Sequence, residues 1–240
     1  MPKVSINILT KNRATLLARA LSSLANQSFE DYQLVIINDG STDTTEEVLK
    51  NLKIENLKII THNAPQGITF SRQEALYAST SEYIAILDDD DEWIDQSKLT
   101  KQLEFLQKHP EYVLIGGAIQ TLSGTKYRAK TDKQIRQTML LRNNFFTSTV
   151  MFRKDAALKA GGFVNDGNDF TEDYDLWLRL GRLGKMYNFQ EIFAKYTTSH
   201  YNKAKFKAFL TKQLRLIKRE KSFYPHYWLS YLILKLRTIF

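Results

Sequence analysis

The first 90 residues alternate short apolar runs with segments of helical periodicity, and this alternation limits the possible folds more than any other feature. Apolar runs predict strands at residues 4–10, 34–38, 57–61 and 83–87. Apolar residues at helical spacing predict helices at residues 14–26, 42–52 and 68–78. Such a βαβαβαβ series forms a mostly parallel sheet that helices cover on both faces. We therefore predict an α/β fold whose ligands bind beyond the carboxyl ends of the strands.

The second half of the chain is less regular. Its pattern predicts helices at 97–108 and 172–183, and strands at 112–119, 144–152 and 192–197. A chain of 240 residues that is 43% hydrophobic can bury a full core. We expect one domain over residues 1–200, a linker near 199–203, and a tail over 201–240 with helices at 206–217 and 227–239.

Cysteine is absent, which excludes disulfides, thiolate catalysis and cysteine-based metal sites, and suits a reducing compartment. Met1-Pro2-Lys3 leads directly into the first strand pattern, so we expect no signal peptide. Every apolar run is shorter than the roughly 18 residues of a membrane span. The expectation is a cytoplasmic protein, soluble or peripheral at the inner face of the cell membrane.

Charge is distributed very unevenly along the chain. Residues 201–240 hold ten Lys or Arg and one acid, whereas residues 1–200 hold 24 basic and 25 acidic residues. A charge confined to one terminus is typical of a docking segment. The sequence leaves three forms of the tail open: an interfacial helix on an anionic membrane, a helix packed on the body or on another subunit, or a nucleic-acid contact.

Two predicted strands end in carboxylates. Asp88 to Asp91 follow the apolar run at 83–87, and Asp39 and Asp43 follow the run at 34–37. Four adjacent carboxylates repel one another, but at a strand end they can bind a hard divalent cation through oxygen ligands. The alternative is a solvated acidic turn in which Asp91 or Asp95 caps the next helix.

Five motifs in order resemble those of family 2 glycosyltransferases of the GT-A fold. They lie at residues 4–13, 38–43, 67–72, 87–93 and 172–177, and the similarity covers roughly residues 3–200. Each motif is weak by itself, but their order and spacing make the resemblance specific. The resemblance implies a GT-A catalytic domain over residues 1–200 that uses a nucleotide-sugar donor.

In that family, carboxylates after the fourth strand hold Mn²⁺ or Mg²⁺ against the diphosphate of the donor. The resemblance assigns the metal to Asp90 and Asp88, with Asp88 or Asp89 facing the ribose. A hard cation suits carboxylate and phosphate oxygens better than zinc does. His200 lies where some family members place a histidine near the metal; its alternative is a surface residue.

The resemblance also assigns nucleotide binding to Thr10, Asn12, Arg13, Asp39 and Arg72. Asp39 corresponds to the residue that accepts the imide N–H of uracil, which favours a UDP-sugar. Its alternative role is an Asx-turn, and the alternative for Arg72 is a surface helix position.

Direct displacement at the sugar carbon requires a carboxylate that takes the proton of the acceptor hydroxyl. Asp173 matches the aspartate of the family's Glu-Asp motif and is the predicted base. Glu172 and Asp175 are assigned to acceptor orientation or to the start of the helix, where acids complement the helix dipole. Trp93 is predicted to line the acceptor site.

These residues predict an inverting, metal-dependent transferase acting on a glycan or lipid-linked acceptor, as in cell-surface polysaccharide synthesis. A sugar nucleotidyltransferase is one alternative, although residues 10–13 lack the glycine-rich basic loop expected of it. A nucleic-acid-binding module that uses the basic tail is another, and the carboxylate clusters disfavour it. Walker and Gly-x-Gly-x-x-Gly loops are missing, which argues against P-loop and dinucleotide enzymes.

Overall fold

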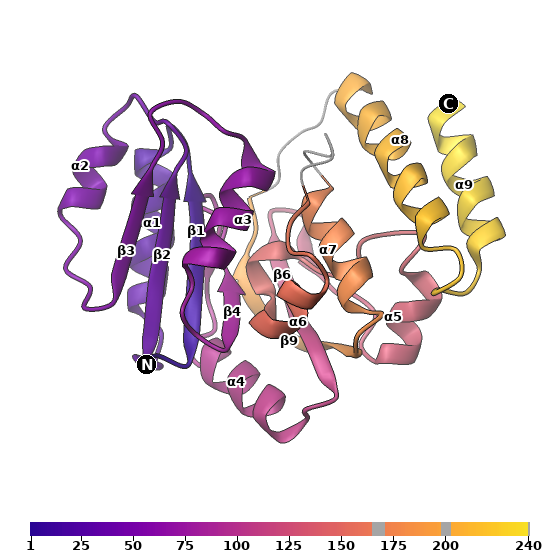
Figure 1. Cartoon of the computed structure of the whole chain (residues 1–240), viewed down its shortest axis with the longest axis horizontal. Helices are drawn as coiled ribbons and strands as arrows, with labels where there is room; N and C mark the ends of the chain where they lie inside the picture. Colours follow the sequence, from indigo (N-terminus) through magenta and orange to yellow (C-terminus); the bar gives the residue numbers. More distant parts are fainter. Residues whose placement is uncertain (165–170, 198–202, 240) are drawn as a thin grey trace.

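Figure 1 shows the computed structural model of the chain, which describes residues 1–164, 171–197 and 203–239. The described residues form one mixed sheet in the order β3-β2-β1-β4-β8-β6-β9-β5, with β7 paired to β6. The strands are β1 Val4–Thr10, β2 Tyr32–Asn38, β3 Leu57–Thr61, β4 Tyr83–Ile86, β5 Glu92–Trp93, β6 Tyr112–Thr121, β7 Gly124–Lys126, β8 Met151–Arg153 and β9 Lys185–Lys195. The predicted α/β fold with a largely parallel sheet is confirmed.

The first four strands place the two acidic turns at one edge of the sheet. Strands β1 to β4 all run parallel, and Thr10 is in register with Asn38, which is in register with Thr61. The N–H of Leu87 donates to the carbonyl of Asn7, so the chain leaves β4 beside β1. Because parallel strands end at the same edge, the residues that follow β1, β2 and β4 meet there.

Helices cover both faces of the sheet (Figure 1). They are α1 Ala14–Ala25, α2 Thr45–Lys50, α3 Ile68–Ala78, α4 Lys98–Lys108, α5 Asp132–Thr138, α6 Lys154–Lys159, α7 Glu172–Leu180, α8 Lys203–Arg219 and α9 Tyr227–Ile239. Side chains alternate along β4: Ile84 and Ile86 join the core under α7, whereas Ala85 and Leu87 join the core under α1 and α4. This two-sided burial explains why the strand reads as a continuous apolar run.

The second half departs most from the sequence prediction. The strand predicted at 144–152 is wrong for most of its length, since residues 147–149 form a 3₁₀ turn and only Met151–Arg153 are a strand. The Thr149 hydroxyl donates to the Phe146 carbonyl at 2.7 Å, which stabilises the turn instead of a ladder. Strand β9 begins at Lys185 rather than 192, α7 ends at Leu180, and α2 covers only Thr45–Lys50. The sequence reading did not predict β5, β7, α5 and α6.

The tail helices form a hairpin beside α7 and α5 (Figure 1). Leu210, Ile217 and Leu234 are buried in the same core as Trp177 of α7. Glu220 is also buried, and it pairs with Arg182 and Arg219. One face of the tail therefore packs on the body, and the division of the chain at residue 200 stays a functional prediction. In the parts of the chain that the structure describes, every helix is too short or too polar to cross a bilayer.

Candidate active site

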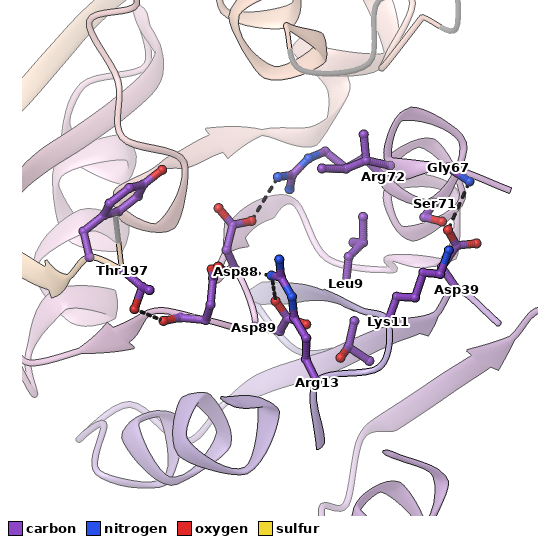
Figure 2. A pocket seen from close by; sticks show the side chains of 14 residues that line it. Leu9, Lys11, Arg13, Asp39, Gly67, Ser71, Arg72, Asp88, Asp89 and Thr197 are labelled. Atoms are coloured by element: carbon purple, nitrogen blue, oxygen red, sulfur yellow. Dashed lines mark hydrogen bonds and ion pairs between the residues drawn. The ribbon is translucent and has the colours of Figure 1, made fainter. Parts of the chain in front are cut away.

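A cleft of about 530 Å³ opens at the carboxyl edge of the sheet. Its walls come from the ends of β1, β2 and β4, the start of α3, and the residues after β9. The lining residues are Leu9, Thr10, Lys11, Arg13, Asp39, Gly67, Ile68, Ser71, Arg72, Asp88, Asp89, Asp90, Tyr196 and Thr197. Figure 2 shows Asp39 on one side of this cleft and Asp88 and Asp89 on the other. The predicted crevice therefore exists, and it joins both acidic turns.

Asp39 is held by the protein through both carboxylate oxygens. Its Oδ1 accepts from the Gln66 N–H at 2.7 Å and contacts His62 Nδ1 at 2.7 Å, and its Oδ2 accepts from the Gly67 N–H at 3.0 Å. Burial acts to raise the pKa of Asp39, but these hydrogen bonds lower it below its usual value. Asp39 therefore forms no Asx-turn, because its oxygens accept from residues 66 and 67, whereas the Asn38 amide oxygen accepts from the Ser41 N–H at 3.1 Å.

Two glycines allow the backbone to approach around Asp39. Gly40 has φ +69°, and a Cβ there would lie 2.8 Å from the Pro65 nitrogen. Gly67 has φ +94° and directs its N–H at the carboxylate. Both dihedrals lie in the region that residues with a Cβ rarely adopt. These positions therefore bring the segment 64–67 against the turn that carries Asp39.

Of the residues predicted after β1, Thr10 and Arg13 line the cleft, as does Lys11, which the sequence reading did not select. Asn12 does not line it. The Asn12 amide oxygen accepts from the Thr42 N–H at 2.7 Å, and its N–H donates to Ser41 Oγ at 2.9 Å. Asn12 thus joins the loops after β1 and β2, which positions its neighbours.

The turn after β4 is crowded and incompletely satisfied. Arg13 pairs with Asp89 at 2.8 Å and with Asp90 at 3.1 Å. Within the described chain, the buried Asp89 Oδ2 has no hydrogen-bond partner. Burial raises the pKa of Asp89 to about 6 and also raises that of Asp90. Burial therefore works against the negative charge of these carboxylates.

Asp91 is buried and does not cap a helix, so the alternative of a solvated helix cap is wrong for Asp91. Its Oδ2 accepts from Ser148 Oγ at 2.5 Å, and its Oδ1 accepts from the Thr197 N–H at 2.8 Å. Burial raises the pKa of Asp91 to about 8. Asp95 instead accepts from the Ser97 N–H just before α4. Asp91 therefore ties the end of β4 to η1 (Thr147–Thr149) and to the segment after β9.

Arg72 is not a surface residue. Its buried guanidinium donates to Asp88 at 2.9 Å and to Glu172 at 3.1 Å. Burial opposes its charge, but Asp88 and Glu172 raise the pKa of Arg72 above its usual value. Figure 2 shows the guanidinium directed toward Asp88. Arg72 thus connects the carboxylate cluster to the start of α7, where Asp173 lies.

Asp173 lies outside the cleft lining and is half-buried, and Thr147 and Asn143 hold its carboxylate. Its Oδ2 accepts from Thr147 Oγ1 at 2.7 Å and from the Asn143 amide at 3.3 Å. Burial raises the pKa of Asp173, and burial with the adjacent Asp173 raises the pKa of Glu172 to about 7. This environment is the kind that adjusts a carboxylate toward proton transfer.

The remaining predicted site residues divide between the core and the undescribed part. Asp175 is buried and pairs with Arg179 and Arg219, so it fastens α7 to α8. Trp93 is buried and donates to the Ser148 carbonyl at 2.6 Å. Glu172, Asp175 and Trp93 do not line the cleft, and the structure gives no support for an acceptor contact by any of the three. His200 lies outside the described residues.

The cleft also contains residues that sequence reasoning missed. Tyr196 and Thr197 line it directly after β9, and Thr197 Oγ1 donates to the Asp90 carbonyl. Their position at a strand end was the signal that could have found them. Across residues 1–164, 171–197 and 203–239, no group of three or more carboxylate or imidazole side chains is arranged so that it could hold a metal ion.

The fold and the cleft define an α/β protein with a carboxylate-lined cleft at the ends of its parallel strands. The sequence profile of Glycosyl transferase family 2 matches residues 5–215. The chain therefore belongs to glycosyltransferase family 2, and the family resemblance and the GT-A fold are confirmed.

One relative by sequence and two solved structures of similar fold illustrate the similarity. The amylovoran biosynthesis glycosyltransferase AmsE of Erwinia amylovora is 28% identical over 191 residues, which cover 77% of this chain and 71% of AmsE. S. aureus TarS 1–349 in complex with UDP-GlcNAc matches with TM-score 0.75 and 16% identity, covering 93% of this chain and 67% of that one. The mannosyltransferase PcManGT of Pyrobaculum calidifontis, in complex with GDP-Man and Mn²⁺, matches with TM-score 0.67 and 16% identity, covering 98% and 69%. The chain spans about two thirds of the length of both solved structures.

Proposed function

We propose that this glycosyltransferase is inverting and metal-dependent, and that it moves a sugar from a UDP-sugar to a hydroxyl of a glycan or lipid-linked acceptor. The observation that carries the proposal is the cleft that joins Asp39 to Asp88, Asp89 and Asp90. One side offers an ordered acceptor for a base, and the other offers oxygen ligands for a cation beside a diphosphate.

The geometry of Asp39 supports uracil as the base. An ionised carboxylate offers about four acceptor positions. His62, Gln66 and Gly67 occupy three of them, which leaves one on Oδ2. Uracil presents one N–H between two carbonyls, whereas guanine presents two adjacent N–H groups. The fold alone does not decide the base, since TarS is bound to UDP-GlcNAc and PcManGT to GDP-Man.

The carboxylate turn fits Mn²⁺ or Mg²⁺. Its donors are oxygens, and the unpartnered Asp89 Oδ2 and the raised pKa of Asp90 indicate negative charge that a cation would relieve. Asp90 and Asp88 would hold the ion, with His200 as a further ligand. When bound, such a cation stabilises the charge that develops on the leaving diphosphate. Arg13 already pairs with Asp90, and Arg72 with Asp88.

Asp173 is the proposed base. As the acceptor oxygen forms its bond to the sugar carbon, the hydroxyl proton passes to Asp173 and the bond to the diphosphate breaks. Thr147 and Asn143 donate to the same oxygen of Asp173, which fixes the carboxylate. Glu172 stays tied to Arg72 and so supports Asp173 without taking the proton. A single displacement of this kind inverts the configuration at the sugar carbon.

Isothermal titration calorimetry with UDP and GDP tests the donor proposal. Wild type should bind UDP with Mn²⁺, bind it much more weakly with EDTA, and bind GDP more weakly than UDP. Asp90→Ala should lose the metal dependence, and a matched change at the exposed Asp31, far from the cleft lining, should not. Equal UDP affinity for wild type in EDTA and Asp90→Ala in Mn²⁺ would remove Asp90 from the metal site.

We propose in addition that the tail docks the enzyme at the inner face of an anionic membrane that carries its acceptor. The buried face of α8 and α9 packs on the body, but Leu229, Leu232 and Leu236 stay exposed, and Trp228 is 77% exposed. Lys235 lies between Leu232 and Leu236, and Arg237 follows Leu236, in a tail that holds ten basic side chains. Each basic residue near an anionic surface adds about 1 kcal/mol of attraction.

Co-sedimentation with liposomes of increasing anionic lipid content tests this docking. Because the tail shares the core, truncation would unfold the protein, and point variants are the better probes. The double variant Trp228→Ala and Leu232→Ala should lose binding and keep its Tm. Binding that salt does not weaken, or binding of labelled oligonucleotides instead of liposomes, would contradict the proposal.

A further inference from the structure

His62 lies between two carboxylates at the back of the predicted base site. It follows β3 directly, and its ring is almost fully buried. Its Nδ1 is 2.7 Å from Asp39 Oδ1, and its Nε2 is 2.7 Å from Glu74 Oε2 on α3. The ring of Phe70 packs edge-on against it at 5.7 Å. The sequence reading gave His62 no role, because Asp39, His62 and Glu74 are far apart along the chain.

The two contacts determine the proton count of the ring. An ionised carboxylate accepts hydrogen bonds and donates none, so each ring nitrogen needs its own hydrogen to make its contact. An imidazole with both hydrogens is the charged imidazolium. Burial opposes this charge, but the bonds to Asp39 and Glu74 outweigh it and raise the pKa of His62. Among the described residues, Asp39 and Glu74 are the charged groups that face the ring.

We propose that His62 is a positioning residue for the nucleotide base, and that its imidazolium fixes the Asp39 carboxylate so that one acceptor position faces the cleft. The inference rests on the proposed function, because it takes Asp39 as the residue that reads the base. His62 itself touches no ligand. It acts by occupying Oδ1, so that Asp39 cannot turn and offer two adjacent acceptors.

This arrangement links base selectivity to the charge of His62. Without the ring, Oδ1 keeps only the Gln66 N–H, and the carboxylate can present a second acceptor. Such a site would accept the paired N–H groups of guanine more readily. With the ring neutral, one nitrogen lone pair would face a carboxylate, and that repulsion would displace Asp39 or Glu74. UDP affinity should therefore be full below the pKa of His62 and fall as pH rises through it.

Two amide variants separate the contacts of the ring. An asparagine amide nitrogen lies near the place of Nδ1, so His62→Asn can still donate to Asp39. A glutamine amide nitrogen lies near the place of Nε2, so His62→Gln keeps the Glu74 side and loses Asp39. Glu74→Gln keeps an acceptor for Nε2 but removes one of the charges that stabilise the imidazolium. His109, which packs on Phe105 away from the cleft lining, provides the control His109→Gln.

The experiment is calorimetry with UDP and GDP, with Mn²⁺, over a pH series for each variant. We expect His62→Gln to weaken UDP binding about tenfold or more, because a hydrogen bond to a charged group is lost. The ratio of UDP affinity to GDP affinity should also become smaller. His62→Asn should bind UDP nearly as tightly as wild type. Its UDP affinity should not fall as the pH rises through the range in which wild-type His62 loses its proton. Glu74→Gln should move that loss to lower pH, and His109→Gln should change neither.

Nitrogen NMR of the histidine rings provides a readout that does not depend on nucleotide. The wild-type protein should show one histidine with both nitrogens protonated at neutral pH, and His62→Asn should lack that signal. A wild type that fails to bind UDP would overturn the proposed function. A wild type that binds UDP, with unchanged affinity and selectivity in His62→Gln or with a neutral His62 ring at pH 7, would overturn the positioning role alone.

Discussion

The two acidic turns look alike in the sequence and differ in the structure. Each follows a buried parallel strand, and both reach the same cleft. Asp39 has both oxygens engaged by protein donors, and its pKa is lowered. Asp89 is also buried but has one oxygen without a partner among the described residues, and its pKa is raised to about 6.

This difference supports different proposed roles for the two turns, base recognition by Asp39 and cation binding by the carboxylates after β4. A carboxylate that backbone N–H groups already satisfy is ionised and fixed, and only its remaining position is open to a base. A crowded carboxylate with raised pKa gains most from a cation that removes the repulsion. Gly40 and Gly67 make the first environment possible, whereas successive aspartates on one turn create the second.

Asp173→Asn should have the largest effect of any single change. Under the proposed function, the two turns bind the donor and this third carboxylate removes the proton. Loss of a general base lowers the rate roughly 10²- to 10⁴-fold. Donor affinity should stay close to wild type, because Asp173 lies outside the residues that line the cleft. Turnover assays with a competent acceptor, beside UDP calorimetry, measure both quantities.

The pH profile gives a second readout of Asp173. Burial raises the pKa of Asp173, and only its ionised form can take a proton. The transfer rate should therefore be low at acid pH and should increase as the pH rises through this pKa. Asn143→Ala should shift the acid limb of the pH–rate profile, because the Asn143 amide donates a hydrogen bond to Asp173 Oδ2. Near-normal turnover in Asp173→Asn would transfer the role to Glu172.

The fold of the first half could be predicted because local pattern and tertiary structure agree there. The strand at 57–61 and the helix at 68–78 match β3 and α3 at both ends. The segment 144–152 could not be predicted in this way. Its composition is typical of a strand, but it forms a turn in which Thr147, Ser148 and Thr149 are buried against residues far away in the sequence. Propensity does not record such long-range hydrogen bonds.

The candidate site shows the same limit. Asp39, Arg72 and Asp88 were found because strand ends and family motifs mark them, and all three line the cleft. Trp93 and Asp175 carry equally suggestive residue types, but their partners Ser148 and Arg219 are far away in sequence. A residue type at a motif position therefore predicts well that the residue lies near the site. It predicts less well whether the side chain lines the cleft, where it could contact a ligand.

Asp39→Asn and Asp89→Asn should change ligand-free stability unequally. Asp39→Asn would direct an amide toward N–H groups that now donate to a carboxylate, and a buried donor without an acceptor costs about 1–3 kcal/mol. Asp89→Asn removes a charge that burial already disfavours, so we expect little loss or a small gain in Tm. Urea unfolding at pH 7 compares the two variants. Equal destabilisation by both changes would mean that the two turns are equally satisfied in the ligand-free protein.

Arg13→Ala should have the smallest effect on stability. It tests whether the carboxylates after β4, unlike Asp39, form a cation site. Arg13 pairs with Asp89 and Asp90, but its side chain is 48% exposed, and exposed ion pairs contribute about 0–1 kcal/mol. The Tm should therefore change little. Removing the guanidinium leaves Asp89 and Asp90 more negative, so half-saturation by Mn²⁺ without nucleotide should require less metal. A Mn²⁺ titration followed by calorimetry measures this change, with Lys50→Ala as the control, because Lys50 pairs with Glu46 on α2 outside the cleft lining. If neither wild type nor Arg13→Ala binds Mn²⁺ in this titration, the cluster is a structural acidic turn and not a cation site.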